Sequence, residues 1–471
     1  MSTISSPGIG SGIDVQSIVS QLVALDKAPL NQLQTQANSI KTKISTYGTI
    51  SSQVSALRDA ASKLASVSGW NAVTATSSNS SAISVTAAAG APTTSLTMEV
   101  SQLARSQSTA SSALASGTAL GTGTLTIELG KWTGSSFAAG GSTPVNITIG
   151  AGEDTLSDIA AKINDADAGV SATVLKDASG ERLLLHSKET GEENGFRITA
   201  TDDDGNHTDA AGLSRLVYDG TSTTGTTRTQ TALNAKAKVN GVDIETASNK
   251  LSDSLPGLTL QLSQVTTAPV LIDVTTDTES IRQNVQTFVD AYNSLNSTLA
   301  TTTKYDASTQ TAGTLQGDST AVGLQNAMRA MMRSTTDSNP FTRLSDIGIS
   351  IQTGGAMSLD ATKFDAALGD LAGLKDLFTV NTGDAVTQGF GRKIQAFADG
   401  LLATDGMVSS RKDALQKALD RNGDEQDKVT DRAARNEKRY LEQYNAMDAA
   451  VAKLSGLSSF VAQQITLWNK S

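Results

Sequence analysis

Apolar residues recur every three or four positions near both ends of this chain, and this repeat is absent from its middle. The spacing places a narrow apolar seam along one face of a helix, as a coiled coil requires. The ends are therefore expected to be helices that pair with each other or with partner subunits, and their seams are the candidate assembly interface. The seam residues are Ile18, Leu22, Leu25, Leu30, Leu33, Ile40, Ile44 and Tyr47 near the start and Tyr440, Tyr444, Met447, Val451, Leu454, Val461, Ile465 and Trp468 near the end.

Two positions interrupt the N-terminal helical pattern. Pro29 is expected either to break the helix or to stand in the first turn of a new one. At Gly48 the heptad spacing slips, because Ile50 follows Tyr47 by only three positions. A slip of this kind beside a glycine indicates a hinge and a domain boundary.

The middle of the chain reads as β structure. Apolar and polar residues alternate there in short segments rich in β-branched residues, which is the pattern of half-buried strands. One amphipathic helix is expected at 155–164, with Thr155 as its cap. Residues 219–231 read as a polar linker. The expected strands are 83–87, 95–101, 124–129, 145–149, 170–175, 182–187, 195–200, 235–239, 257–265 and 270–275.

The helical period returns at Thr278 and continues to the end of the chain. Within it, the mixed-charge stretch 411–439 reads as a solvated helix face, because its charges nearly balance. A seam at each end also permits a simpler arrangement, in which the two ends pair antiparallel within one monomer. Further helices are expected at 319–333, 361–369, 371–378, 384–402 and 407–468.

These patterns predict an α+β multidomain chain in which terminal helices form a coiled-coil or helical-bundle stem and leg, with two β-rich domains inserted between them. A chain of 471 residues is long enough for three or four domains. The expected division is a terminal leg (1–46 and 425–471), a helical stem (47–72 and 278–424), a β-rich plate (73–130 and 232–277) and an inserted outer β-rich domain (131–231).

Composition narrows the function. The formal charge of −10 disfavours nucleic acid and anionic membrane surfaces as partners, and no apolar run approaches the length of a membrane span. The chain has no cysteine, so disulfides and thiolate sites are excluded. The first residues do not resemble a cleavable secretory signal. The chain is therefore expected to be cytoplasmic or exported by a route that reads no such signal.

Signals for catalysis or cofactor binding are weak. The glycines at 8, 10 and 12 resemble a dinucleotide loop, but no strand precedes them. Asp202, Asp204 and Asn206 resemble the start of a calcium loop, but the residues that should complete it are wrong, and a solvated turn is the better interpretation. His186 reads as a structural histidine on a strand. A carboxylate pair for glycoside cleavage is not excluded by motif, yet nothing selects one. We expect no enzyme and no cofactor.

Several motifs occur in order along almost the whole chain, among them GIGSGIDVQSIVSQLVALDKAPL (8–30) and VNITIGAGEDTLSDIAAKIN (145–164) followed by GVSATV (169–174). The first looks like the start of the bacterial flagellar filament cap protein (hook-associated protein 2) family, and the second resembles the hook motif that cap proteins share with flagellins. Other similar segments are TMEVSQLARSQS (97–108), 237–262, 314–329, 344–368 and 440–461.

The resemblance implies a structural role in assembly. Proteins of this family are exported unfolded through the flagellar type III apparatus and form a ring of four to six copies at the filament tip. Their β domains make a plate, their terminal helices act as legs, and the cap promotes flagellin folding and insertion while preventing leakage of monomers. The expected partners are copies of the chain itself, flagellin, hook–filament junction proteins and a cytoplasmic export chaperone, and the expected location is the extracellular tip of the filament.

Two other functions remain open at this stage. One is a tip adhesin that binds mucin or host glycans through the β domains, with the polar loops 130–144 and 202–231 as contact surface. The other is a flagellin or a hook–filament junction protein. A discrete ring in electron micrographs would favour the cap over a flagellin.

Overall fold

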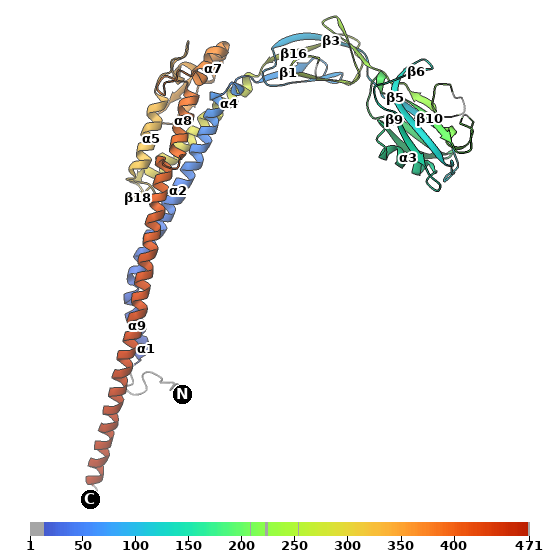
Figure 1. Ribbon diagram of the computed structural model, residues 1–471. Coiled ribbons are helices and arrows are strands. Elements are labelled where there is room, and N and C mark those ends of the chain that lie inside the picture. Colours follow the sequence, from blue (N-terminus) through green and yellow to red (C-terminus); the bar gives the residue numbers. More distant parts are fainter. Residues whose placement is uncertain (1–13, 208, 222–224, 253, 470–471) are drawn as a thin grey trace. The chain divides into compact units, whose positions relative to one another are not determined.

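The computed structural model describes residues 14–207, 209–221, 225–252 and 254–469, and the chain forms two compact units (Figure 1). The helical unit combines Met1–Trp70 with Glu279–Ser471, and the β unit is Asn71–Thr278. Because both ends of the chain belong to one unit, the β unit is an insertion between them. This arrangement of terminal helices around a β-rich middle confirms the predicted α+β fold class.

Two helices begin the described chain. Helix α1 (Val15–Asp26) is capped by Asp14, whose Oδ1 accepts the N–H of Ser17 at 2.9 Å. Helix α2 (Ala28–Ala65) follows after a single residue and carries Pro29 in its first turn, where the missing N–H costs no helical hydrogen bond. Of the two roles considered for Pro29, the first-turn role is the one observed.

Helix α2 runs through Gly48 without interruption, so the predicted hinge at that residue is wrong. The slip in heptad spacing reflects a change in what the helix packs against. Tyr47 and Ile50 are both fully buried, and from there on α2 belongs to the main core of the helical unit. A glycine inside a helix costs only about 1 kcal/mol relative to alanine, which packing on this scale easily offsets.

The rest of the helical unit follows the β insertion. Its core gathers large side chains that are fully buried, among them Tyr47, Phe288, Tyr292, Phe364 and Phe378. The elements are α4 (Thr278–Thr303), β17 (Tyr305–Asp306), β18 (Thr311–Ala312), α5 (Ser319–Met332), η4 (Leu344–Ile347), β19 (Ile349–Ile351), β20 (Met357–Leu359), α6 (Ala361–Ala367), η5 (Leu368–Asp370), α7 (Leu371–Thr379), α8 (Phe390–Leu402) and α9 (Met407–Trp468); η1 (Val67–Gly69) precedes the insertion.

Helix α8 starts at Phe390, six residues later than the sequence predicted. The segment before it forms turns in which side chains bind the backbone. Asp384 Oδ1 accepts the N–H of Val386 at 2.9 Å, and the N–H of Gly389 donates to the carbonyl of Val380 at 2.8 Å. Local bonds of this kind compete with helix formation.

The first core of the β unit lies between two antiparallel sheets. One has the strand order β1-β16-β3-β12-β13 and the other the order β14-β15-β2. Their shared core includes Met98, Leu260 and Ile272, each fully buried. The strands are β1 (Val73–Ser77), β2 (Ile83–Ala87), β3 (Thr94–Gln102), β12 (Ala235–Val239), β13 (Val242–Thr246), β14 (Lys250–Leu251), β15 (Leu258–Leu262) and β16 (Val270–Thr276).

The second core of the β unit is formed by two further sheets and helix α3 (Leu156–Asp165). Thr155 caps α3 as predicted, and Leu156, Ile159 and Ile163 enter the core. One sheet has the order β10-β5-β6 with β7 also paired to β5, and the other has the order β11-β4-β9-β8. The strands are β4 (Ser108–Ala110), β5 (Gly123–Thr133), β6 (Ser136–Ala139), β7 (Val145–Ile149), β8 (Val170–Asp177), β9 (Gly180–Ser187), β10 (Gly195–Asp202) and β11 (Thr227–Gln230); η2 (Glu192–Asn194) and η3 (Gly212–Leu216) lie between them.

Two sequence expectations fail in this second core. The domain boundary expected between residues 130 and 131 falls inside β5, whose Leu125 and Ile127 pack in this core. The segment 219–231 is not wholly a linker, because its β11 pairs with β4. Both strands are rich in Ser and Thr and lack an apolar alternation, so only their pairing partners reveal them. The sheets around the second core thus begin with β4 at Ser108.

Removing one buried side chain from the helical unit tests its core. Leu57 on α2 is 1% exposed, so Leu57→Ala should lower the free energy of unfolding of this unit by about 2–5 kcal/mol, from lost burial and the residual cavity. Urea titration followed by the helical circular dichroism signal measures the change. Val386→Ala, at a side chain 70% exposed, is the control and should leave the midpoint unchanged. Equal effects of the two substitutions would contradict this account of the core.

Candidate assembly interface

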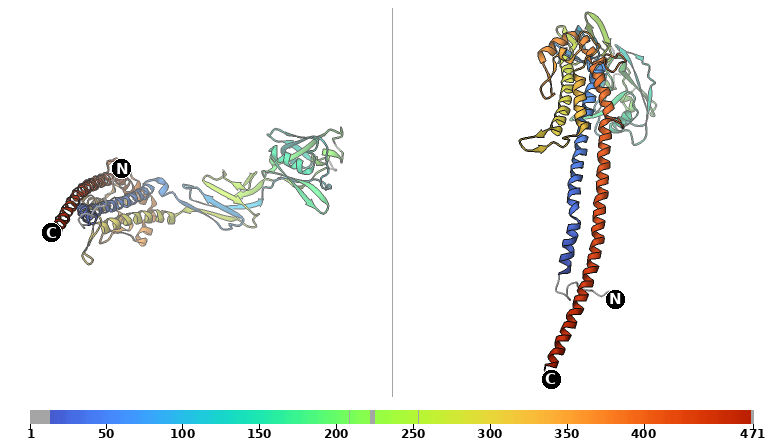
Figure 2. Two further views of the ribbon diagram at one scale, coloured as in Figure 1. Left: turned by 90° about the horizontal axis from the view of Figure 1, so that it is seen from below. Right: turned by 90° about the vertical axis from the view of Figure 1, so that its left-hand side faces the viewer.

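Helices α1 and α2 pack against α9 in antiparallel fashion within one chain (Figure 2). Asn422 Nδ2 lies 3.4 Å from Gln36 Oε1, and Asn436 Nδ2 lies 2.9 Å from Asp26 Oδ2. The residue number rises along α9 while it falls along the partner helices. The ends of the chain therefore pair with each other, which is the intramolecular arrangement that the sequence left open.

A buried polar cluster ties this helix pair to the core. The Tyr47 hydroxyl on α2 donates to Asp318 Oδ1 at 2.8 Å, and Arg411 on α9 donates to Asp318 Oδ2 through Nε at 3.0 Å and Nη2 at 2.8 Å. Asp318 also caps α5, accepting the N–H of Thr320 at 3.0 Å. One carboxylate thus joins three helices.

The surroundings of this cluster keep Asp318 and Tyr47 in the protonation states that their hydrogen bonds require. Burial by itself raises the pKa of the Asp318 carboxyl, but the hydrogen bond from Tyr47 and the bonds and charge of Arg411 outweigh burial, and the net pKa is lowered. Burial, together with the adjacent Asp318 carboxylate, raises the pKa of the Tyr47 hydroxyl. Asp318 therefore stays ionised as the acceptor and Tyr47 stays protonated as the donor.

A small apolar cluster joins α1 to α9 further along. Val15, Val19 and Val23 are buried together with Ala433, and Tyr440 and Tyr444 pack against them. Of the α1 residues expected in the seam, Ile18 and Leu22 are half-buried and Leu25 is 71% exposed. Val19 and Val23, the buried residues, are therefore the next residues in sequence after the expected Ile18 and Leu22. The spacing of four between the valines was the signal that could have found it.

The seam on α2 lies against a part of α9 that the sequence analysis did not select. Tyr47 is buried, and the other seam residues of α2, namely Leu30, Leu33, Ile40 and Ile44, are half-buried. Opposite them stands the mixed-charge stretch 411–439, in which Leu415, Asn422 and Ala433 are buried. Most of this stretch is exposed, as expected of a solvated helix face, while these three residues show that its other face is packed. Of the predicted C-terminal seam, Tyr440 and Tyr444 thus lie against the valines of α1, whereas the seam of α2 lies against the mixed-charge stretch.

Beyond Tyr444 helix α9 presents apolar residues that no other described segment covers (Figure 1). Of the expected seam residues there, Val451 is half-buried, while Met447, Leu454, Val461 and Ile465 are 38–65% exposed. The side chain of Trp468 lies outside what the structure describes. Sequence reasoning missed Leu457, Phe460 and Leu467, which are also exposed and form a second stripe beside the first.

Two adjacent stripes make a wider apolar face than a single coiled-coil seam. A face of this width suits contact with more than one neighbouring helix. None of the helices that the structure describes is long and apolar enough to cross a membrane.

The sequence also offered candidate metal, histidine and glycine-loop sites, and the structure places most of them. The residues that the structure describes contain no group of three or more metal-ligating side chains. Asp204 and Asn206 are exposed, as expected of a solvated turn, but Asp202 is buried and its Oδ2 accepts the N–H of Ser214 in η3 at 2.9 Å. His186 lies on β9 as predicted, but it is exposed rather than part of the core. The glycines at 8, 10 and 12 lie outside the described residues.

Comparison with known proteins gives the family. The family model described as flagellar hook-associated protein 2 N-terminus matches residues 11–107, and the one described as flagellar hook-associated protein 2 C-terminus matches residues 232–456. Between them, residues 124–189 match the flagellin hook IN motif. Flagellar hook-associated protein 2 of Escherichia coli K12 is 33% identical over 479 residues, which is 98% of each chain. The chain belongs to the flagellar hook-associated protein 2 family.

Further relatives of this family member agree with the assignment. Flagellar hook-associated protein 2 of Salmonella typhimurium is 32% identical over 337 residues, 70% of each chain. The crystal structure of the D1-D2-D3 domains of the flagellar cap protein FliD from Escherichia coli is 31% identical with a TM-score of 0.62, and it covers 79% of this chain and 99% of that chain. The predicted family is therefore confirmed, and with it the connection to the flagellum.

Removing the Tyr47 hydroxyl tests the polar cluster. Tyr47→Phe deletes one hydrogen bond to a buried carboxylate and should lower the free energy of unfolding by about 1–3 kcal/mol. Chemical denaturation followed by circular dichroism measures the change. The matched control is Tyr305→Phe, at a tyrosine 48% exposed. A loss no greater than that of the control would show that the cluster does not stabilise the fold.

The cluster should also make stability depend on pH. The pKa of Asp318 is lower in the folded chain than in the unfolded chain, so its contribution is complete above the unfolded pKa of about 3.9 and is lost as the pH falls through the folded pKa. The difference in unfolding free energy between the natural chain and Asp318→Asn should therefore be constant near neutral pH and shrink below about pH 4. Urea titrations across this range measure it. A difference that grows in acid contradicts the assignment.

Proposed function

We propose that this protein forms the oligomeric cap at the distal tip of the flagellar filament, where it promotes the folding and insertion of flagellin and prevents the loss of monomers. The observation that carries the proposal is the end of α9, where two apolar stripes stand exposed on a helix whose earlier part is packed. Membership of the hook-associated protein 2 family supports it, as does the similarity to an Escherichia coli protein described as a flagellar cap protein.

The exposed stripes suit contacts that form and break repeatedly. Burying one side chain such as Leu454, Leu457 or Phe460 contributes about 1.5–3 kcal/mol at most. Immobilising side chains on association offsets about 0.5–1.5 kcal/mol for each. The net contact of one helix end with the filament is therefore modest. Such contacts let the cap change position as each flagellin subunit is added, whereas very tight contacts would hold it in place.

The proposed partners follow from this role. The chain assembles with copies of itself into a ring of four to six subunits and contacts flagellin at the filament end. Before that it meets an export chaperone in the cytoplasm, and the hook–filament junction proteins are neighbours at the start of filament growth. A chain without cysteine passes an export channel unfolded with no crosslink to hinder it.

The cap is favoured over the other functions considered. The hook IN motif alone would fit a flagellin as well, because its description names flagellin. The matches over nearly the full length are to hook-associated protein 2. Those names favour a cap over a glycan-binding adhesin, a flagellin or a junction protein, and no feature of the described surface selects one of these alternatives.

A triple substitution on the exposed end of α9 tests the proposal. Leu454→Ser, Leu457→Ser and Phe460→Ser together should abolish filament growth, because they remove apolar area needed by partner helices. The unfolding midpoint should not change, since these side chains are 57–65% exposed and belong to none of the buried clusters of the described chain. Swimming on soft agar and electron microscopy of cells lacking their own cap gene give the readout, with secretion of the variant checked by immunoblot.

The matched control replaces the exposed serines of the same stretch, Ser455, Ser458 and Ser459, by alanine. This control should support normal filaments. Normal filaments from the leucine and phenylalanine variant would overturn the proposed role of the α9 end. Electron microscopy of the purified natural protein should show a discrete ring, and filaments of the protein alone would indicate a flagellin instead.

A further inference from the structure

Two neighbouring cavities in the helical unit share Ser334 and are lined by basic side chains without an acidic one. The first has a volume of about 340 Å³ and includes Arg333 and Arg343, and the second has a volume of about 390 Å³ and includes Lys393. We call the pair the Ser334 cleft. In a chain where 47 acidic residues outnumber 37 basic ones, this lining is a local reversal of charge. Both volumes are in the range of ligand sites.

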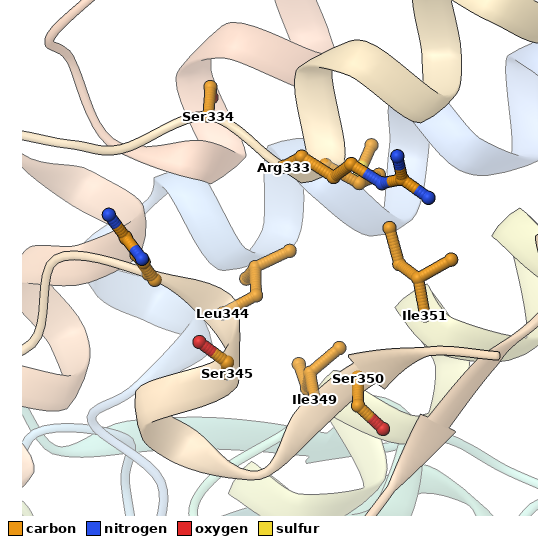
Figure 3. A pocket seen from close by; sticks show the side chains of 9 residues that line it. Arg333, Ser334, Leu344, Ser345, Ile349, Ser350 and Ile351 are labelled. Atoms are coloured by element: carbon orange, nitrogen blue, oxygen red, sulfur yellow. The ribbon is translucent and has the colours of Figure 1, made fainter.

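The first cavity has an apolar wall below one of its cations. Leu344, Ile349 and Ile351 point into the same space, and Arg333 extends across from them (Figure 3). Ile349 and Ile351 are two positions apart on β19 and therefore face the same side of that strand. Such a spacing matches alternate side chains of an extended segment laid alongside.

The strand that borders this cavity has an edge open for pairing. Among the described strands, β19 pairs only with β20. The far edge of β20 is covered, because the Asn293 side chain accepts the N–H of Met357 at 2.7 Å and donates to its carbonyl at 2.9 Å. Neighbouring side chains of a strand point to opposite faces of its sheet. The cavity nevertheless touches three successive residues of β19, namely Ile349, Ser350 and Ile351, so it reaches the backbone edge of that strand. An unpaired edge of this kind is a template for a further strand.

The two arginines of the first cavity are available to a partner. Arg333 and Arg343 are exposed, and neither guanidinium forms an ion pair among the residues that the structure describes. The carboxylate nearest in sequence, Asp346, is occupied by the backbone, since its Oδ2 accepts the N–H groups of Thr342 and Arg343, each at 2.9 Å. Exposed guanidinium groups without an ion pair of their own pair well with carboxylates from another chain.

The second cavity adds a buried cation. Lys393 is 5% exposed, and its Nζ donates to the carbonyl of Thr335 at 2.6 Å and to Ser334 Oγ at 3.2 Å. Neither acceptor is an anion, and in the described part of the chain this ammonium forms no ion pair. The Asp384 carboxylate favours this ammonium through its charge but forms no ion pair with it in the described chain, so a carboxylate brought by a ligand would further compensate the cost of burying the cation. Met331 and Phe397 supply an apolar wall beside it.

We propose that the Ser334 cleft binds an extended segment of another polypeptide in which aliphatic and acidic residues alternate. The segment adds a strand to the open edge of β19. Its aliphatic side chains pack beside Ile351, the partly exposed residue of this wall, because Ile349 is only 2% exposed. Its carboxylates pair with Arg333 and Arg343, with Lys393 as a further anchor beyond Ser334. The site belongs to the helical unit and is independent of the exposed end of α9, so it stands whether or not the proposed cap function does.

A peptide-binding experiment on the full-length protein tests the inference. The probe is a fluorescent, end-blocked hexapeptide that alternates Glu and Val, and its binding is measured by fluorescence anisotropy at low and high salt. We expect saturable binding that weakens with salt. Arg333→Glu with Arg343→Glu should weaken binding at least about tenfold, since two charge-assisted contacts become repulsive. A peptide methylated on alternate backbone nitrogens should lose binding to a similar degree.

Three controls make the outcome decisive. A peptide that alternates Lys and Val should not bind. Arg421→Glu with Arg435→Glu reverses two exposed charges elsewhere in the helical unit and should leave the affinity unchanged. Circular dichroism should confirm that both double variants are folded. Equal binding of the acidic and basic peptides, or no effect of backbone methylation, overturns the inference. A change in oligomeric state by the cleft variant without a change in peptide affinity also overturns it, in favour of a contact between copies of this chain.

Discussion

The antiparallel packing of α2 against α9 is the interaction on which the rest of the helical unit depends. It brings the first and last parts of the chain together in one unit, into which the β unit Asn71–Thr278 is inserted. Tyr47, Asp318 and Arg411 fix how far along each other the two helices lie, because one buried carboxylate must satisfy a donor on each of them and also cap α5. Shifting either helix by one turn would leave a buried charge without its partners, which is strongly unfavourable.

Helix α9 changes its surroundings along its length, and the proposed function follows from that change. Its first part lies in the main core with Leu415 buried, its middle meets the valines of α1, and its last part presents Leu457 and Phe460 to solvent. One continuous helix thus transmits the rigidity of the core to an unpaired apolar end. The Ser334 cleft is a separate feature of the same unit. In the cleft, it is the basic lining without an acidic residue that indicates a partner, whereas at the end of α9 it is the uncovered apolar stripes.

Particular residues show where prediction from sequence succeeded and where it failed. Thr155 capped α3 as predicted, because an N-cap acts through its immediate neighbours. The hinge at Gly48 was wrong because the slip in spacing recorded a change of packing partner and not a break in the backbone. The strand β11 was missed because Thr and Ser segments pair only when a distant strand offers an edge. Val19 and Val23 of α1 were passed over for neighbours that fit the heptad better, although both are buried in the cluster that joins α1 to α9.

The sequence by itself determined the class of fold, most elements and the helical character of both ends, because these depend on spacing and on contacts a few residues away. Its ordered motifs also indicated the flagellar family. Only the tertiary structure decided which faces meet. The mixed-charge stretch of α9 packs against α2, the α9 end remains uncovered within the described chain, and Ser334 lies between two cationic cavities. The helix pairing joins residues as distant as Gln36 and Asn422, and the two cavities join segments between Met331 and Phe397. Local periodicity carries no record of such pairings.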